Sequence, residues 1–255
     1  MPLFRFAGIQ VFLHWSWFFA AAVMVEMRSG RGFTNSMALL TVLSLFGIVL
    51  LHEFGHALAC RSVGGHANTI ILWPLGGVAF VKPPSRPGPV LWSIAAGPLV
   101  NVVLVPVTIA VWYWSGAPSL AEALPTLHLL PAAQQYAVSL AFMNVMLLIF
   151  NMLPVYPLDG GQVVQAILWF FVGRATSLKI VAWLGLVAAA VGGLLALWKY
   201  EYWLMIMAGF LVWQAFNGLR TARVLALIEK HEGYAAWRSP VEIHQRPDSP
   251  PRESV

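Results

Sequence analysis

The chain has 255 residues, of which 59% are hydrophobic and only 10% are charged, and its mean hydropathy is +0.74. Soluble domains carry about 25% charged residues, so this composition excludes a soluble globular enzyme and indicates an integral membrane protein. The net charge of +5 comes from dispersed basic residues, so we expect no nucleic-acid partner, and a single cysteine excludes an internal disulfide.

Long apolar stretches recur along the chain. A helix needs about 20 apolar residues to cross a hydrocarbon core of about 30 Å. We therefore predict an all-α membrane protein, a polytopic bundle of about six transmembrane helices in contact with the lipid bilayer. The predicted spans are residues 9–27, 37–60, 89–114, 133–153, 178–198 and 202–224.

The basic residues predict the orientation of these spans. With a cytoplasmic N-terminus, all but three of the 15 basic residues fall on the cytoplasmic side, the exceptions being Arg28, Arg31 and Lys199. The positive-inside rule then places both termini in the cytoplasm, and we expect a plasma membrane of bacterial type. Residues 1–228 would form the transmembrane domain. Residues 229–255, with four prolines, would form a polar cytoplasmic tail.

In chain order, the first polar feature is His14, near the cytoplasmic end of the first predicted span. It either lines a cavity or makes a structural hydrogen bond, and the sequence favours neither. The second predicted span contains His-Glu-Phe-Gly-His at residues 52–56. His52 and His56 lie on one face of a helix and can hold one zinc ion, with Glu53 beside them as a candidate general base. Such groups are costly inside a membrane, which favours a functional role. The position of the two histidines opens the site toward the cytoplasm.

The helical pattern stops after the second span. Residues 69–73 are rich in β-branched and aromatic side chains, residues 74–77 have turn composition, and residues 78–81 are apolar. This pattern predicts a short β-hairpin. Because the edge of a sheet cannot face lipid, the hairpin must lie at the interface or against protein.

The third zinc ligand has few candidates. No acidic residue occurs between Glu53 and Glu122, and Glu122 falls in an outside loop, so the next acid within the apolar architecture is Asp159. Two prolines and two glycines in residues 154–161 break the helix beside it. A catalytic zinc has three protein ligands and one open position, so we predict one zinc per chain on His52, His56 and Asp159.

Three motifs carry a family resemblance: His-Glu-Phe-Gly-His at 52–56, Gly-Pro-Leu-Val-Asn at 97–101, and Asn-x-x-Pro-x-x-Pro-Leu-Asp-Gly-Gly at 151–161. With them the chain resembles the site-2 protease family of intramembrane zinc metalloproteases over about residues 8–170. The resemblance implies the same aspartate ligand and an activating glutamate. The chain has room for neither an inserted PDZ domain nor a C-terminal CBS domain, so we expect a minimal member.

The expected function is zinc-dependent cleavage of peptide bonds in or near transmembrane segments of membrane proteins, as in regulated intramembrane proteolysis. Glu53 would take a proton from water and pass it to the leaving amine. Asn101, Asn151 and His14 are candidates for binding the substrate or the oxyanion. For Asn101, a hydrogen bond that only links helices is an equal alternative. The hairpin offers a strand edge to the unwound substrate.

Two other functions remain open at this stage. Intramembrane histidines and acids also mark ion pathways, so a metal-ion transporter or channel is the main alternative. An inactive homologue that acts as a scaffold is the second, although an intact Glu53 weighs against it. Cys60 lies one turn beyond His56, and we interpret it as a buried packing residue and not as a ligand.

Overall fold

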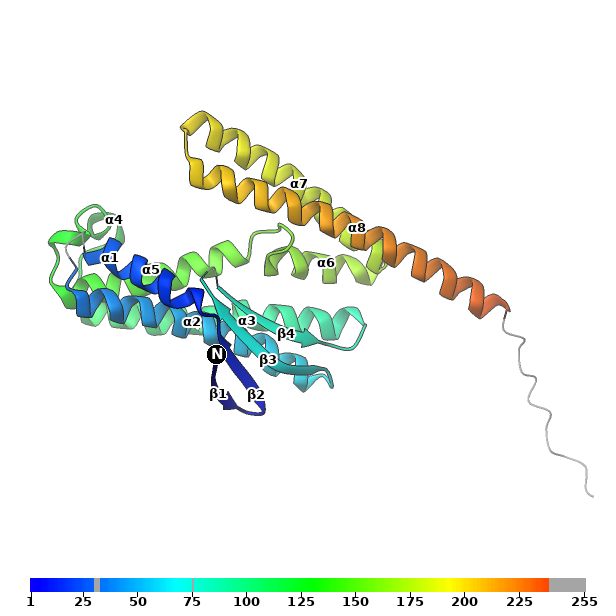
Figure 1. Ribbon diagram of the computed structural model, residues 1–255, viewed down its shortest axis with the longest axis horizontal. Coiled ribbons are helices and arrows are strands. Elements are labelled where there is room, and N and C mark those ends of the chain that lie inside the picture. The colour runs from blue at the N-terminus through cyan, green and yellow to red at the C-terminus, as the bar shows by residue number, and fades with distance from the viewer. Residues whose placement is uncertain (30–32, 75, 239–255) are drawn as a thin grey trace, which may run out of the picture.

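The computed structural model describes residues 1–29, 33–74 and 76–238, and it is mainly helical with one small mixed β-sheet (Figure 1). The helices are α1 (Ser16–Ser29), α2 (Asn35–Ser62), α3 (Pro87–Trp114), α4 (Leu120–Ala123), α5 (Ala132–Asn151), α6 (Asp159–Val172), α7 (Arg174–Lys199) and α8 (Tyr202–Arg238), with a 3-10 turn η1 (Leu127–Leu129). The strands are β1 (Pro2–Phe6), β2 (Ile9–Leu13), β3 (His66–Trp73) and β4 (Gly76–Lys82). Of the predicted tail, residues 229–238 continue α8, and the remainder lies outside the described residues.

Four helices of the described part, α2, α3, α5 and α7, are long and apolar enough to cross a membrane. They correspond to the second to fifth predicted spans. Helix α8 starts at the sixth predicted span and runs on for 37 residues in total. The count of six crossings therefore stays a prediction.

The first predicted span is not one helix. Residues 9–13 form strand β2, and α1 has only 14 residues, or about 21 Å, which is shorter than the hydrocarbon core. The reason lies in the period of the apolar residues. Ile9, Val11 and Leu13 alternate with less buried neighbours, and this pattern of two places them on one face of a strand. An uninterrupted hydropathy profile does not reveal that alternation.

The predicted hairpin is confirmed as β3 and β4, but it belongs to a larger sheet of order β1-β2-β3-β4. Strand β2 runs parallel to β3, and the other neighbours are antiparallel. The buried face of the sheet, with Val11 and Ile70, packs on Ala57 and Cys60 of α2. The sheet therefore covers the end of α2 that carries the histidine motif, and β4 is an outer strand. Cys60 is fully buried in this core, as a packing residue would be.

Helix α2 lies against α3, which in turn packs on α5 and α6 (Figure 1). The approach of α2 to α3 is close because Gly55 has no side chain: a Cβ there would lie 2.6 Å from the carbonyl oxygen of Ala96. Helices α7 and α8 pair with one another, and α7 also contacts α6. The histidine motif of α2 thus lies between α3 and the sheet.

The predicted break is the loop between α5 and α6. Helix α6 folds back on this loop at close range, since a Cβ on Gly160 would lie 2.4 Å from the backbone of Met152. The side chain of Gln162 donates a hydrogen bond to the carbonyl of Pro157, which closes the loop (2.9 Å). This loop places Asp159 at the first position of α6.

Candidate metal centre

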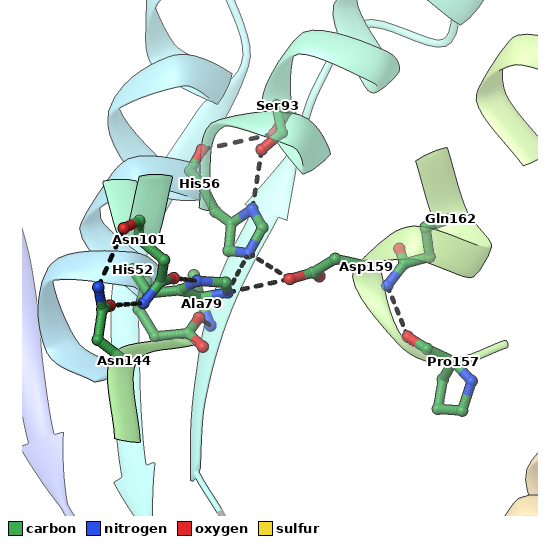
Figure 2. A network of polar contacts seen from close by, with 10 residues as sticks. His52, His56, Ala79, Ser93, Asn101, Asn144, Pro157, Asp159 and Gln162 are labelled. Carbon is green, nitrogen blue, oxygen red and sulfur yellow. Dashed lines mark hydrogen bonds and ion pairs between the residues drawn. The ribbon is translucent and has the colours of Figure 1, made fainter. Parts of the chain in front are cut away.

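Helices α2 and α6 bring three metal-ligand side chains together, although 107 positions separate His52 from Asp159 (Figure 2). The Nε2 atoms of His52 and His56 are 3.1 Å apart. The Oδ2 atom of Asp159 lies 3.0 Å from Nε2 of His52 and 3.4 Å from Nε2 of His56. The three donor atoms form a nearly equilateral triangle, and both histidines are buried.

This triangle has the size that zinc requires. Tetrahedral zinc binds imidazole nitrogen and carboxylate oxygen at about 2.0–2.2 Å, which separates neighbouring ligand atoms by about 3.3 Å. Two imidazoles and one carboxylate also match the donor set of catalytic zinc sites, which keep a fourth position open. The three residues therefore fit a zinc ion.

The far edges of the two imidazole rings are fixed by hydrogen bonds. His56 Nδ1 lies 2.9 Å from the backbone carbonyl oxygen of Ser93, and His52 Nδ1 lies 2.6 Å from Oδ1 of Asn101. A carbonyl oxygen only accepts, so Nδ1 of His56 carries the proton and its Nε2 presents a lone pair to the centre. Second-shell partners of this kind orient metal-bound histidines in general.

Gly97 of α3 makes room for the two imidazoles. A Cβ at this position would lie 2.2 Å from Nε2 of His56 and 2.8 Å from Nε2 of His52. No side chain other than hydrogen can occupy this place while both nitrogens keep their positions. The glycine of the 97–101 motif is therefore a steric requirement of the site.

Strand β4 holds Glu53. The carboxylate of Glu53 is buried, and its Oε2 accepts a hydrogen bond from the backbone N–H of Ala79 (2.7 Å). Gly77 lies against the same side chain, since a Cβ there would be 2.4 Å from Cγ of Glu53. Glu53 is not one of the three clustered ligands, yet it lies within electrostatic range of them.

The other three candidate site residues, Asn101, Asn151 and His14, lie in different surroundings. Asn101 is fully buried on α3 and contacts His52 on the edge of the ring away from Asp159. Asn151 ends α5, and its side chain makes no hydrogen bond within residues 1–29, 33–74 and 76–238. His14 is exposed, and its Nδ1 lies 2.5 Å from Oγ of Ser16. It also lines a pocket of about 230 Å³ beside β3 and β4, so it makes a hydrogen bond and borders a cavity.

Several residues of the site escaped sequence reasoning. Ala79 contributes its backbone N–H, and Ser93 contributes its backbone carbonyl to Nδ1 of His56. Backbone groups leave no side-chain signal in a sequence. The Ser93 hydroxyl also donates to the backbone carbonyl of His56 (3.4 Å). Gly97 belongs to the motif at residues 97–101, but its close approach to both imidazoles arises only in the folded structure. Asn144, which hydrogen-bonds Asn101, had a signal: it is an amide within the apolar span 133–153.

The comparisons with known proteins decide the family. The model of peptidase family M50 matches residues 40–130 and 126–195. The chain belongs to peptidase family M50. A zinc metalloprotease of Methanocaldococcus jannaschii is 30% identical over 224 residues, which cover 87% of this chain and 61% of that protein. Stage IV sporulation protein FB of Bacillus subtilis is 33% identical over 124 residues, covering 48% of this chain and 38% of that protein.

A solved structure agrees with this M50 assignment. The site-2 protease from Methanocaldococcus jannaschii matches with a TM-score of 0.58 and 25% identity, over 86% of this chain and 94% of that one. The predicted site-2 protease family is therefore confirmed. The chain spans between 56% and 61% of the length of the curated relatives that it matches over most of its own length.

Proposed function

We propose that the protein is a zinc-dependent endopeptidase that hydrolyses peptide bonds in or near transmembrane segments of other membrane proteins. The observation that carries this proposal is the convergence of His52, His56 and Asp159 beside Glu53, a buried carboxylate that is not part of the triangle. Three ligands and a separate base are the protein groups that a hydrolytic zinc site needs.

His52, His56 and Asp159 would hold one zinc ion per chain. When bound, zinc supplies Lewis acidity, which makes water acidic enough to attack at neutral pH and polarises the scissile carbonyl. Glu53 takes the proton of the attacking water and then delivers it to the leaving amine nitrogen. The hydrogen bond from Ala79 fixes one carboxylate oxygen, Oε2, and leaves Oε1 for this proton transfer.

The substrate would be a transmembrane helix that unwinds locally before attack. Ala79 pairs with Ile70 in the sheet, yet its N–H donates to Glu53, so this N–H points to the outer side of β4. An extended substrate segment that adds to this edge runs past the general base. The strand edge would thus bring the peptide bond and Glu53 together.

The orientation in the membrane follows the distribution of charge. With both termini in the cytoplasm, the zinc site opens to the cytoplasmic side of a plasma membrane of bacterial type. Residues 1–228 constitute the protease domain and residues 229–255 a polar tail. A substrate is then cut near the cytoplasmic end of its transmembrane segment.

A metal-ion transporter is less well supported. Transport through a membrane needs a succession of polar or ionisable sites along the pathway. Across the described ranges, the one cluster of three or more metal-ligand side chains is His52, His56 and Asp159. The hydrogen bond that fixes Glu53 to β4 suits a general base.

The Glu53→Gln variant tests the proposal. Glutamine keeps the size of the side chain and leaves all three ligands in place, but it cannot accept a proton. We expect full zinc content and no cleavage of a co-expressed single-span membrane substrate with Glu53→Gln, and full cleavage with the exposed control Glu201→Gln. Cleavage at the wild-type rate by Glu53→Gln would refute the role of this residue.

A further inference from the structure

Two fully buried asparagines connect helices α3 and α5 behind His52 (Figure 2). Nδ2 of Asn101 donates to Oδ1 of Asn144 (2.8 Å), and Nδ2 of Asn144 donates to the backbone carbonyl of Asn101 (3.1 Å). Oδ1 of Asn101 is 2.6 Å from Nδ1 of His52. Three helices, α2, α3 and α5, are thus linked by one chain of hydrogen bonds.

The direction of this chain is fixed at one end. The backbone carbonyl of Asn101 has no hydrogen to give, so the NH₂ group of Asn144 must face it. Oδ1 of Asn144 then faces the side chain of Asn101, which must donate a hydrogen bond to it from its own NH₂ group. That leaves Oδ1 of Asn101 for His52, whose Nδ1 must carry the proton. Nε2 of His52, on the side of Asp159, is then the ring nitrogen available to bind the metal.

We propose that Asn144 is a positioning residue for zinc binding, which orients the amide of Asn101 and thereby selects the tautomer of His52. This inference rests on the proposed zinc site. It concerns a residue that touches neither the metal nor the substrate. Outer-shell partners of metal-bound histidines typically contribute 10- to 100-fold to metal affinity, and this is the size of the effect we expect.

The need for such a residue differs between the two histidines. The partner of His56 is the backbone carbonyl of Ser93, which can only accept a hydrogen bond. The partner of His52 is a primary amide, which offers an acceptor in one orientation and a donor in the other. Turned over, Asn101 would favour the tautomer that aims a proton from Nε2 of His52 at the metal position. Asn144 blocks that alternative.

Zinc affinity of the full chain in detergent, measured by competition with a chromophoric chelator, tests the inference. Asn144→Leu removes both hydrogen bonds, and we expect it to weaken zinc binding about 10- to 100-fold. Asn217→Leu, the same substitution on α8 and outside the site, is the control, and we expect wild-type affinity. Unchanged affinity in Asn144→Leu would overturn the inference.

A second background separates orientation from packing. In Asn101→Asp, both side-chain oxygens accept from Nδ1 of His52, so no orientation has to be selected. We expect Asn144→Leu to cause no further loss of zinc affinity in this background. An equal loss in both backgrounds would show that Asn144 only holds the helices together, and would overturn the inference.

The wild-type protein provides a test that needs no variant to fold. Nitrogen-15 spectra of the histidines in zinc-free protein distinguish a protonated from an unprotonated ring nitrogen. We expect a proton on Nδ1 of His52, the nitrogen that faces Asn101, and an unprotonated Nδ1 would overturn the inference. Failure of the wild-type protein to bind zinc would instead refute the proposed function.

Discussion

Gly97 provides a sharp test of the site because one added carbon atom reaches both histidines. In Gly97→Ala, the new Cβ would lie 2.2 Å from Nε2 of His56 and 2.8 Å from Nε2 of His52. The ordinary range of contact begins at 3.4 Å, so the His56 ring must retreat by about 1 Å or α3 must move away. The first adjustment changes the triangle of ligand atoms directly. The second withdraws Ser93 and Asn101, the hydrogen-bond partners that orient the two imidazoles.

The expected magnitude follows from the tolerance of zinc coordination. Ligand distances in a zinc site agree with the standard values to within about 0.2 Å, far less than the shift required. We therefore expect the affinity for zinc to fall about 100-fold or more, which corresponds to about 2.8 kcal/mol. Helix propensity alone predicts the opposite direction, since alanine in place of Gly97 would stabilise α3 by about 1 kcal/mol. A loss of zinc affinity in Gly97→Ala would therefore come from the steric contact.

The assay compares the zinc affinity of Gly97→Ala with that of Gly47→Ala in the purified full chain. Gly47 lies on α2, as the histidines do, and a Cβ there meets nothing within 4 Å. We expect wild-type affinity for Gly47→Ala and a large loss for Gly97→Ala. Wild-type zinc affinity in Gly97→Ala would refute the steric argument.

Two further predictions concern β4 and the general base. In Gly77→Ala, the new Cβ would lie 2.4 Å from Cγ of Glu53 and would displace this side chain. We expect cleavage to fall strongly while zinc content, measured by metal analysis, stays at the wild-type level. Loss of zinc together with cleavage would contradict the view that Gly77 acts on the base and not on the ligands. A photo-crosslinking amino acid in place of Phe80, which is 56% exposed on the same outer strand, should capture the substrate in the Glu53→Gln protein. Capture at Tyr113, which is exposed at the far end of α3, but not at Phe80 would refute binding at the strand edge.

The convergence of His52, His56 and Asp159 was predictable because their chemistry is rare inside a membrane. A charged or imidazole side chain in an apolar span is costly, so His52, His56 and Asp159 stand out against their surroundings. The glycines and prolines around Asp159 likewise predict a break in the helix. In the structure this break is the loop between α5 and α6, and α6 begins at Asp159.

The N-terminal strands and the second shell of the site were not predictable in the same way. Hydropathy alone treats residues 9–27 as one span, but β2 gains its partners from β1 and β3, and β3 lies more than 50 residues away. The backbone groups of Ser93 and Ala79 carry no signature at all. The need for glycine at positions 97 and 77 comes from side chains that pack against them only in the folded protein.

The central claim is that α2 and α6 share one zinc ion, and metal analysis of the purified full chain tests it most directly. We predict one zinc per wild-type chain and a large loss of zinc in Asp159→Ala. Asp248→Ala, which changes the other aspartate of the sequence, serves as the control and should keep one zinc per chain. Full zinc content in Asp159→Ala, or a wild-type chain that binds none, would contradict the account.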